Sequence, residues 1–92
     1  MVWQIRLTDT AKKQLAKLDK AVAKSITAYL RDRVMPLDNP KALGKPLTKN
    51  FSPYWRYRVG DCRVICNIES EVLTIMVVRI GRRKSVYKKP IK

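Results

Sequence analysis

The sequence predicts an α+β fold in which a helical hairpin covers one face of a single, mostly antiparallel sheet. An alternating segment opens the chain, two amphipathic helical segments follow, and a three-stranded antiparallel meander with short turns comes last. Helices gathered on one side of such a sheet leave the opposite face uncovered. The 92 residues are expected to form one domain, residues 1–92.

The first strand and helix are predicted from local pattern. Residues 2–7 alternate, with Trp3, Ile5 and Leu7 on one face. The Thr-Asp-Thr run at residues 8–10 supplies N-cap chemistry for a helix that begins there. The apolar side of this helix carries Ala11, Leu15 and Leu18.

A second helix is predicted after Asp19, which can cap it. Its apolar positions recur at helical spacing, so the two helices form a short hairpin with one apolar face. The residues that follow this spacing are Val22, Ile26, Tyr29 and Leu30, and the basic residue Arg33 continues it.

Residues 34–47 contain three prolines and Gly44, which predicts a connecting loop rather than a helix. Three strands are then expected at residues 54–59, 62–68 and 72–80. The Gly60-Asp61 pair predicts a two-residue hairpin turn, because glycine adopts a positive φ without steric cost. Residues 69–71 are expected to form the second turn.

The charge is strongly positive. Twenty-one Lys and Arg against seven Asp and Glu give a net charge of +14. Such a field favours binding to nucleic acid, to an anionic membrane surface or to an acidic protein. No apolar run is long enough to span a bilayer, and Met1 leads directly into the alternating segment without a signal-peptide core. The expected location is therefore the cytoplasm, with no membrane partner.

Metal and disulfide chemistry are not expected. The chain has no histidine and two cysteines, too few ligands for a zinc site. Cys62 and Cys66 are four apart on a predicted strand, so their Cα atoms lie roughly 13 Å apart, beyond disulfide reach. We expect both to be small buried hydrophobic residues, and we expect no metal and no cofactor.

The arginines of the predicted hairpin are expected to cluster. Alternation puts Tyr54, Arg56 and Arg58 on one face of their strand, and the two-residue turn pairs Arg58 with Arg63. Like charges placed directly opposite each other are destabilising unless they hold an anion. The pattern favours a phosphate-binding surface, and a solvated basic face is the alternative.

RNA cleavage is one reaction that such a surface can perform. Attack of a ribose 2′-hydroxyl on the adjacent phosphorus requires proton transfer and stabilisation of the phosphorane charge. Arginines supply the second requirement. Tyr87 lies among Lys84, Lys88 and Lys89, and nearby positive charge favours its phenolate. Alternatively, Tyr87 is an aromatic residue that packs on the sheet edge.

Three segments together resemble the RelE toxins of the RelE/ParE superfamily. They are residues 39–47, residues 55–65, and the run Arg79-Ile-Gly-Arg-Arg-Lys-Ser-Val-Tyr87, and with the order of elements the similarity covers nearly the whole chain. The resemblance implies a toxin that is a metal-independent endoribonuclease, cutting messenger RNA codons in the ribosomal A site and leaving a 2′,3′-cyclic phosphate. It also implies an acidic RelB-like antitoxin, through which the complex binds operator DNA and represses its own operon.

The resemblance also implies site residues. The catalytic set that it gives is Arg56, Arg58, Arg63, Arg83 and Tyr87. Residues expected to contact messenger RNA or ribosomal RNA are Lys45, Lys49, Arg82, Lys84, Lys88 and Lys89. Some relatives carry lysines at the second-strand pair, but arginine cannot act as a base near neutral pH. The base is then Tyr87, or the site relies mainly on electrostatic stabilisation.

Two other functions compete with the nuclease. One is a ParE-like gyrase poison, which binds protein and performs no RNA chemistry. The other is a non-catalytic nucleic-acid-binding module. Such a module commonly stacks bases on exposed aromatic side chains, whereas Trp55 and Tyr57 are predicted to face the core.

Overall fold

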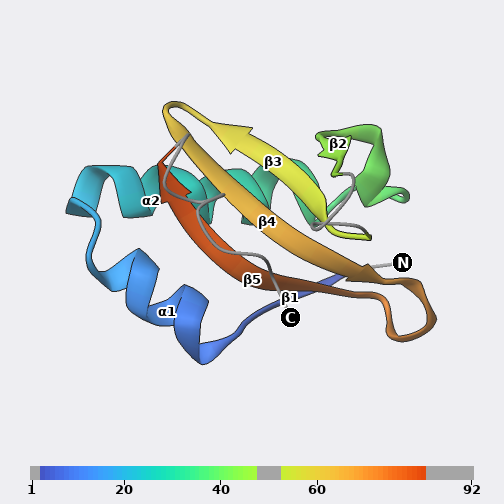
Figure 1. Cartoon of the computed structure of the whole chain (residues 1–92). Coiled ribbons are helices and arrows are strands. Elements are labelled where there is room, and N and C mark those ends of the chain that lie inside the picture. Colours follow the sequence, from blue (N-terminus) through green and yellow to red (C-terminus); the bar gives the residue numbers. More distant parts are fainter. Residues whose placement is uncertain (1–2, 48–52, 83–92) are drawn as a thin grey trace.

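The computed structural model, which describes residues 3–47 and 53–82, confirms the α+β fold. Five strands form one sheet in the order β1-β5-β4-β3-β2 (Figure 1). Their bounds are Gln4–Leu7 for β1, Lys45–Pro46 for β2, Trp55–Val59 for β3, Cys62–Glu69 for β4 and Thr74–Arg82 for β5. β1 runs parallel to β5, and the other neighbours are antiparallel.

Strand β1 shows the predicted alternation. Trp3, which precedes it, is buried, and Ile5 and Leu7 pack against the core, whereas Gln4 and Arg6 are exposed. This division follows from the period of two in a strand, which sends the apolar side chains to the helix-covered face. Residue 2 of the predicted strand lies outside the described residues.

Two helices cover one face of the sheet. The helix α1 (Asp9–Ala16) packs mainly on β5, and α2 (Lys20–Tyr29) contacts β3 (Figure 1). Thr8 is the N-cap of α1, as predicted, and its hydroxyl oxygen accepts a hydrogen bond from the amide of Ala11 at 3.2 Å. Asp19 is at the N-cap position of α2 but its side chain makes no capping hydrogen bond. A π-helical turn, η1 (Leu30–Val34), extends α2 into the region predicted as a loop.

Residues 35–47 are more ordered than predicted. They contain a 3₁₀ turn, η2 (Pro40–Ala42), and the two-residue strand β2, which the sequence pattern did not indicate. Three aromatic donors bind backbone carbonyl groups of this segment. Trp3 Nε1 donates to Asp38 O at 3.2 Å, the Tyr57 hydroxyl to Pro40 O at 2.7 Å, and Trp55 Nε1 to Leu43 O at 2.8 Å. These bonds replace the backbone pairing that a loop lacks and hold the segment against the sheet.

The first hairpin turn is confirmed at Gly60-Asp61, where Gly60 has a φ of +57°. The second turn is longer than predicted. It forms a 3₁₀ turn, η4 (Ser70–Val72), followed by Leu73 in the left-handed region at a φ of +47°. The prediction that a strand begins at residue 72 is therefore wrong, because the chain is still reversing direction there and Val72 is exposed.

The two cysteines are buried and unbridged, as expected. Both lie on β4 and face the helices, in a core that also contains Ile26, Tyr57 and Val64. Burial raises the pKa of the Cys66 thiol, because the thiolate would lose its hydration.

Candidate functional site

Strands β3, β4 and β5 carry four arginines on the helix-free face of the sheet, and we name this group the arginine face. They are Arg56 and Arg58 on β3, Arg63 on β4 and Arg79 on β5. Arg58 lies directly opposite Arg63, which confirms the predicted hairpin register. The Cβ atoms of such opposed residues are about 5 Å apart, so the two guanidinium groups can reach one anion.

A cross-strand row lies beside this pair. Arg56 is opposite Ile65, and Ile65 is opposite Arg79 on its other side. Lys45 of β2 is opposite Arg56, so the predicted contact residue Lys45 shares the face and is exposed. The strand β2, which anchors Lys45 beside the arginines, therefore extends the basic surface to the edge of the sheet.

The four arginines differ in exposure. Arg58 is exposed, whereas Arg56 and Arg79 are half-buried. Arg63 is only 6% exposed, and its Nη1 donates to the carbonyl oxygen of Cys62 at 3.4 Å. Hydrogen bonds and charges act over a lower effective dielectric when buried. A charge interaction made by Arg63 is thus less screened than one made by a fully solvated arginine.

Few acidic side chains lie on the same face of these strands. On the helix-free face of β4 the acid is Glu69, which accepts a hydrogen bond from Asn67 Nδ2 at 3.3 Å. Glu69 lies six residues from Arg63 along β4, roughly 20 Å at about 3.3 Å per residue. Within the described part of the chain, the side-chain ion pair joins Arg31 to Asp32, on η1. On the helix-free faces of β3 and β4, three arginines therefore stand against one carboxylate, which gives this part of the sheet a net positive charge.

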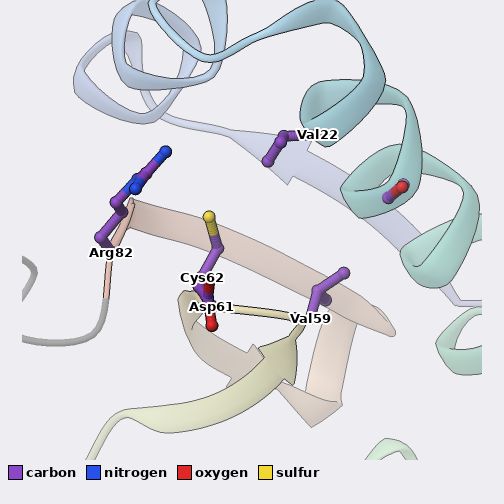
Figure 2. Close-up of a pocket in the computed structure, with 7 residues that line it drawn as sticks. Val22, Val59, Asp61, Cys62 and Arg82 are labelled. Carbon is purple, nitrogen blue, oxygen red and sulfur yellow. The ribbon is translucent and has the colours of Figure 1, made fainter.

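Arg82, a predicted RNA contact, lies on the other side of the sheet. It is opposite Cys62 on β4. Figure 2 shows the side chain of Arg82 and the sulfur of Cys62 directed toward the side of the sheet on which Val22 of α2 lies. These residues line a cleft of about 230 Å³ beneath α2, together with Ser25. The strand alternation thus separates Arg82 from the arginine face.

Arg79 was missed as a site residue by sequence reasoning. The register between β4 and β5 shifts at Ile65 and Cys66, which leaves Val78 without an opposite residue on β4 and turns Arg79 to the helix-free face. A signal for this was present, because Val77 and Ile80 are three apart in a strand and both apolar. Simple alternation cannot bury both.

The remaining predicted site residues lie outside the described residues. They are Lys49, Arg83, Lys84, Tyr87, Lys88 and Lys89. The segment with the last five continues directly from β5. Trp55 and Tyr57 face the helices, as predicted, so no base-stacking platform comes from these two.

The donor set of the site suits anions. Guanidinium groups present planar arrays of donors that match phosphate oxygens and remain protonated at all physiological pH values.

Among residues 3–47 and 53–82, no group of three or more His, Cys, Asp or Glu side chains is placed to bind a metal ion. None of the helices within these residues has the length and apolar character needed to cross a bilayer.

Comparison with known proteins identifies the family. The sequence profile of the ParE toxin of the type II toxin–antitoxin system parDE matches residues 5–87. The chain belongs to this family. It is therefore a toxin of a type II toxin–antitoxin system, in the RelE/ParE superfamily that the sequence resemblance indicated.

The toxin is also similar to curated proteins of Mycobacterium tuberculosis (strain ATCC 25618 / H37Rv). It is 25% identical to toxin RelG over 89 residues, covering 97% of this chain and 100% of RelG. It is 28% identical to toxin RelE over 86 residues, covering 94% of this chain and 87% of RelE.

Solved structures confirm the fold. The RelBE2 toxin–antitoxin complex from Mycobacterium tuberculosis contains a chain that matches with a TM-score of 0.81 at 24% identity, covering 90% of this chain and 93% of that one. A chain of the intact Escherichia coli RelBE complex matches with a TM-score of 0.69 at 13% identity, covering 89% of this chain and 98% of that one.

Proposed function

We propose that this toxin is a ribosome-dependent endoribonuclease that cuts messenger RNA codons in the A site. The observation that carries the proposal is the opposed pair Arg58 and Arg63, one exposed and one nearly buried, on the helix-free face of the sheet. Similarity to toxins named RelG and RelE over nearly their whole length adds support.

In the proposed reaction, the 2′-hydroxyl of the first nucleotide attacks the adjacent phosphorus. The bond from phosphorus to the 5′-oxygen of the next nucleotide breaks, leaving a 2′,3′-cyclic phosphate and a 5′-hydroxyl. The proton lost by the 2′-hydroxyl is balanced by the proton gained by the leaving oxygen. The cleavage is thus a transesterification, and the protein must stabilise charge and move protons.

Arginines fit the first of these tasks. Negative charge accumulates on the nonbridging oxygens of the phosphorane, and preorganised donors aimed at it stabilise the transition state more than the ground state. We assign this role to Arg58 and Arg63, together with Arg83 outside the described residues. Arg56 holds the neighbouring nucleotide in line for attack.

Proton transfer needs another group, because arginine does not give up its proton near neutral pH. We assign the base to Tyr87, whose sequence neighbours include three lysines. If Tyr87 is not the base, catalysis rests on arginine electrostatics and on the ribosome, which orients the codon. Lys45, Lys49, Lys84, Lys88 and Lys89 are the proposed contacts to messenger RNA and ribosomal RNA, and Arg82 is proposed to contact RNA from the other side of the sheet.

The net charge of +14 also supports an acidic partner. We propose a RelB-like antitoxin, because the structures similar to this toxin include complexes described as RelBE toxin–antitoxin complexes. The antitoxin neutralises the basic surface, and through it the complex binds operator DNA and represses its own operon. The toxin acts in the cytoplasm, where its messenger RNA substrate is translated.

A gyrase poison is the second candidate, favoured by the name of the matched family profile, which is that of ParE. Brief expression in bacterial cells separates the two. The nuclease halts protein synthesis within minutes and produces primer-extension stops at codon-registered positions of translated messages. A DNA-damage response with intact messages and continuing translation would support the gyrase poison and reject the nuclease.

A further inference from the structure

A β-bulge in β5 determines which side chain joins the arginine face. Cys66 is opposite Val77 and Ile65 is opposite Arg79, so Val78 is skipped. In an unbroken ladder Ile65 would be opposite Val78, and Arg79 would point toward the helices. The bulge instead places Arg79 on the helix-free face and leaves Val77 and Ile80 buried in the core at 0% and 2% exposed. Bulges commonly re-aim a side chain in this way near functional sites.

Polar groups at the start and middle of α1 hold the bulged segment. The parallel pairing of β1 with β5 ends at Leu7 and Val77. Immediately afterwards the amide of Thr8 donates to Val77 O at 3.0 Å, and the Thr8 hydroxyl donates to Val78 O at 3.4 Å. The amide of Ile80 then donates to Gln14 Oε1 at 2.7 Å.

Gln14 thus does for β5 what a neighbouring strand would do. Its acceptor satisfies a strand amide that β1 is too short to reach, since β1 ends at Leu7. α1 is itself fixed, because Ala11 is fully buried and the helix packs on β5. The bond from Ile80 to Gln14 therefore ties the bulged register to a rigid element.

The bulge gives the face a regular geometry across three strands. Arg56, Ile65 and Arg79 form one row, and Arg58, Arg63 and Gly81 form the next. The rows are two residues apart, roughly 7 Å along the strands. Ile65 between the arginines is fully buried, and Gly81 beside Arg63 carries no side chain.

We propose that Arg79 binds a backbone phosphate of the RNA next to the scissile one, and that Gln14 is the positioning residue that keeps Arg79 there. This proposal rests on the proposed function. Arg79 supplies binding energy that is present before and during the reaction, so its loss weakens binding more than it slows the chemical step. Gln14 acts only through the register of β5.

The first test replaces Arg79 with Gln and measures Kd for ribosomes programmed with a defined A-site codon, over a series of salt concentrations. We expect binding to weaken about tenfold, the slope of log affinity against log salt to fall by roughly 0.7 to 1, and the single-turnover rate at saturation to change less than about threefold. Lys13→Gln, an exposed position on α1, removes the same charge away from the sheet and should leave the slope unchanged. An unaltered Kd and slope for Arg79→Gln would overturn the assignment.

The second test concerns Gln14. Gln14→Met keeps the length of the side chain and removes the acceptor, whereas Gln14→Glu keeps an acceptor. We expect faster amide exchange at Ile80 and part of the Arg79→Gln binding defect in the Met variant, and restoration of binding in the Glu variant. In a double-mutant cycle, Gln14→Met should have no further effect on binding once Arg79 is Gln. Full additivity of the two changes would show that Gln14 does not act through Arg79.

These outcomes separate the inference from the proposed function. If the unchanged toxin fails to cut the codon on programmed ribosomes, the nuclease itself is rejected. If it cuts, and the cycle shows no coupling between Gln14 and Arg79, only the role assigned to the bulge is rejected.

Discussion

Replacement of Gly44 by alanine is a sharp test of how the basic edge of the sheet is built. Gly44 has a φ of +76°, just before β2. A Cβ atom added there would collide with the carbonyl oxygen of Arg56, and would lie 2.9 Å from Trp55 Nε1 and 3.0 Å from Tyr57 Cδ1. The first neighbour is backbone of β3 and cannot rotate away. Alanine therefore forces β2 and β3 apart.

The magnitude follows from two contributions. An alanine in the left-handed region costs about 1–2 kcal/mol. Separation of β2 from β3 also weakens the bonds from Leu47 N to Tyr54 O, at 3.0 Å, and from Trp55 Nε1 to Leu43 O, at 2.8 Å. At about 1 kcal/mol for each bond, we expect Gly44→Ala to lower the free energy of unfolding by about 3–4 kcal/mol.

Gly60→Ala is the matched control. Gly60 also has a positive φ, +57°, but an added Cβ would have no atom within 4 Å. Only the backbone contribution of about 1–2 kcal/mol remains. Urea denaturation followed by circular dichroism measures both variants, with unchanged m values as the sign that the transition stays two-state. Equal destabilisation by the two replacements would refute the close packing of the Gly44 segment on β3.

Three further predictions follow from the buried thiol, the proposed base and the charge. Because the pKa of the Cys66 thiol is raised in the folded protein, the unfolded chain loses this proton first as pH rises. Ionisation of the thiol should therefore lower the free energy of unfolding by about 1.4 kcal/mol between about pH 7.5 and about pH 9.5. Cys66→Val should remove this pH dependence, and an unchanged slope of unfolding free energy against pH in the variant would contradict the prediction. Tyr87→Phe should slow single-turnover cleavage at least about tenfold and flatten its rise with pH; wild-type cleavage by this variant alongside a defect in Tyr87→Ala would reduce Tyr87 to a packing or stacking residue. Association with the acidic antitoxin should slow steeply as salt rises, as surface plasmon resonance can measure, because screening removes electrostatic steering; a salt-independent on-rate would argue against charge-driven assembly.

The register of the arginine hairpin could be predicted from sequence for a physical reason. A two-residue turn at Gly60-Asp61 leaves one pairing of the flanking strands, so Arg58 must oppose Arg63. The alternation of apolar residues then assigns Trp55 and Tyr57 to the core. Turn geometry and burial agree here, and no tertiary contact is needed to choose between alternatives.

The features that could not be predicted depend on contacts between distant segments. The strand β2 has two residues, one of them Pro46, and forms because Trp55 and Tyr57 bind the carbonyl groups of the preceding segment. The bulge that reorients Arg79 is held by Gln14, 66 residues away along the chain. None of these bonds leaves a periodic pattern in the sequence. Strand β2 therefore became evident only in three dimensions, whereas the three-residue spacing of the apolar Val77 and Ile80 was a sequence signal for the bulge.

The most direct test of the central claim is single-turnover cleavage of one message with and without ribosomes. A message with a defined codon in the A site of purified ribosomes is mixed with excess toxin, and the same RNA is mixed with toxin alone. We predict cleavage within the A-site codon, leaving a 2′,3′-cyclic phosphate, and a loss of at least about a hundredfold in rate for Arg63→Ala, equivalent to about 3 kcal/mol of transition-state stabilisation. Equal cleavage of free RNA, or wild-type activity in Arg63→Ala with the codon bound, would contradict a ribosome-dependent nuclease that works through the arginine face.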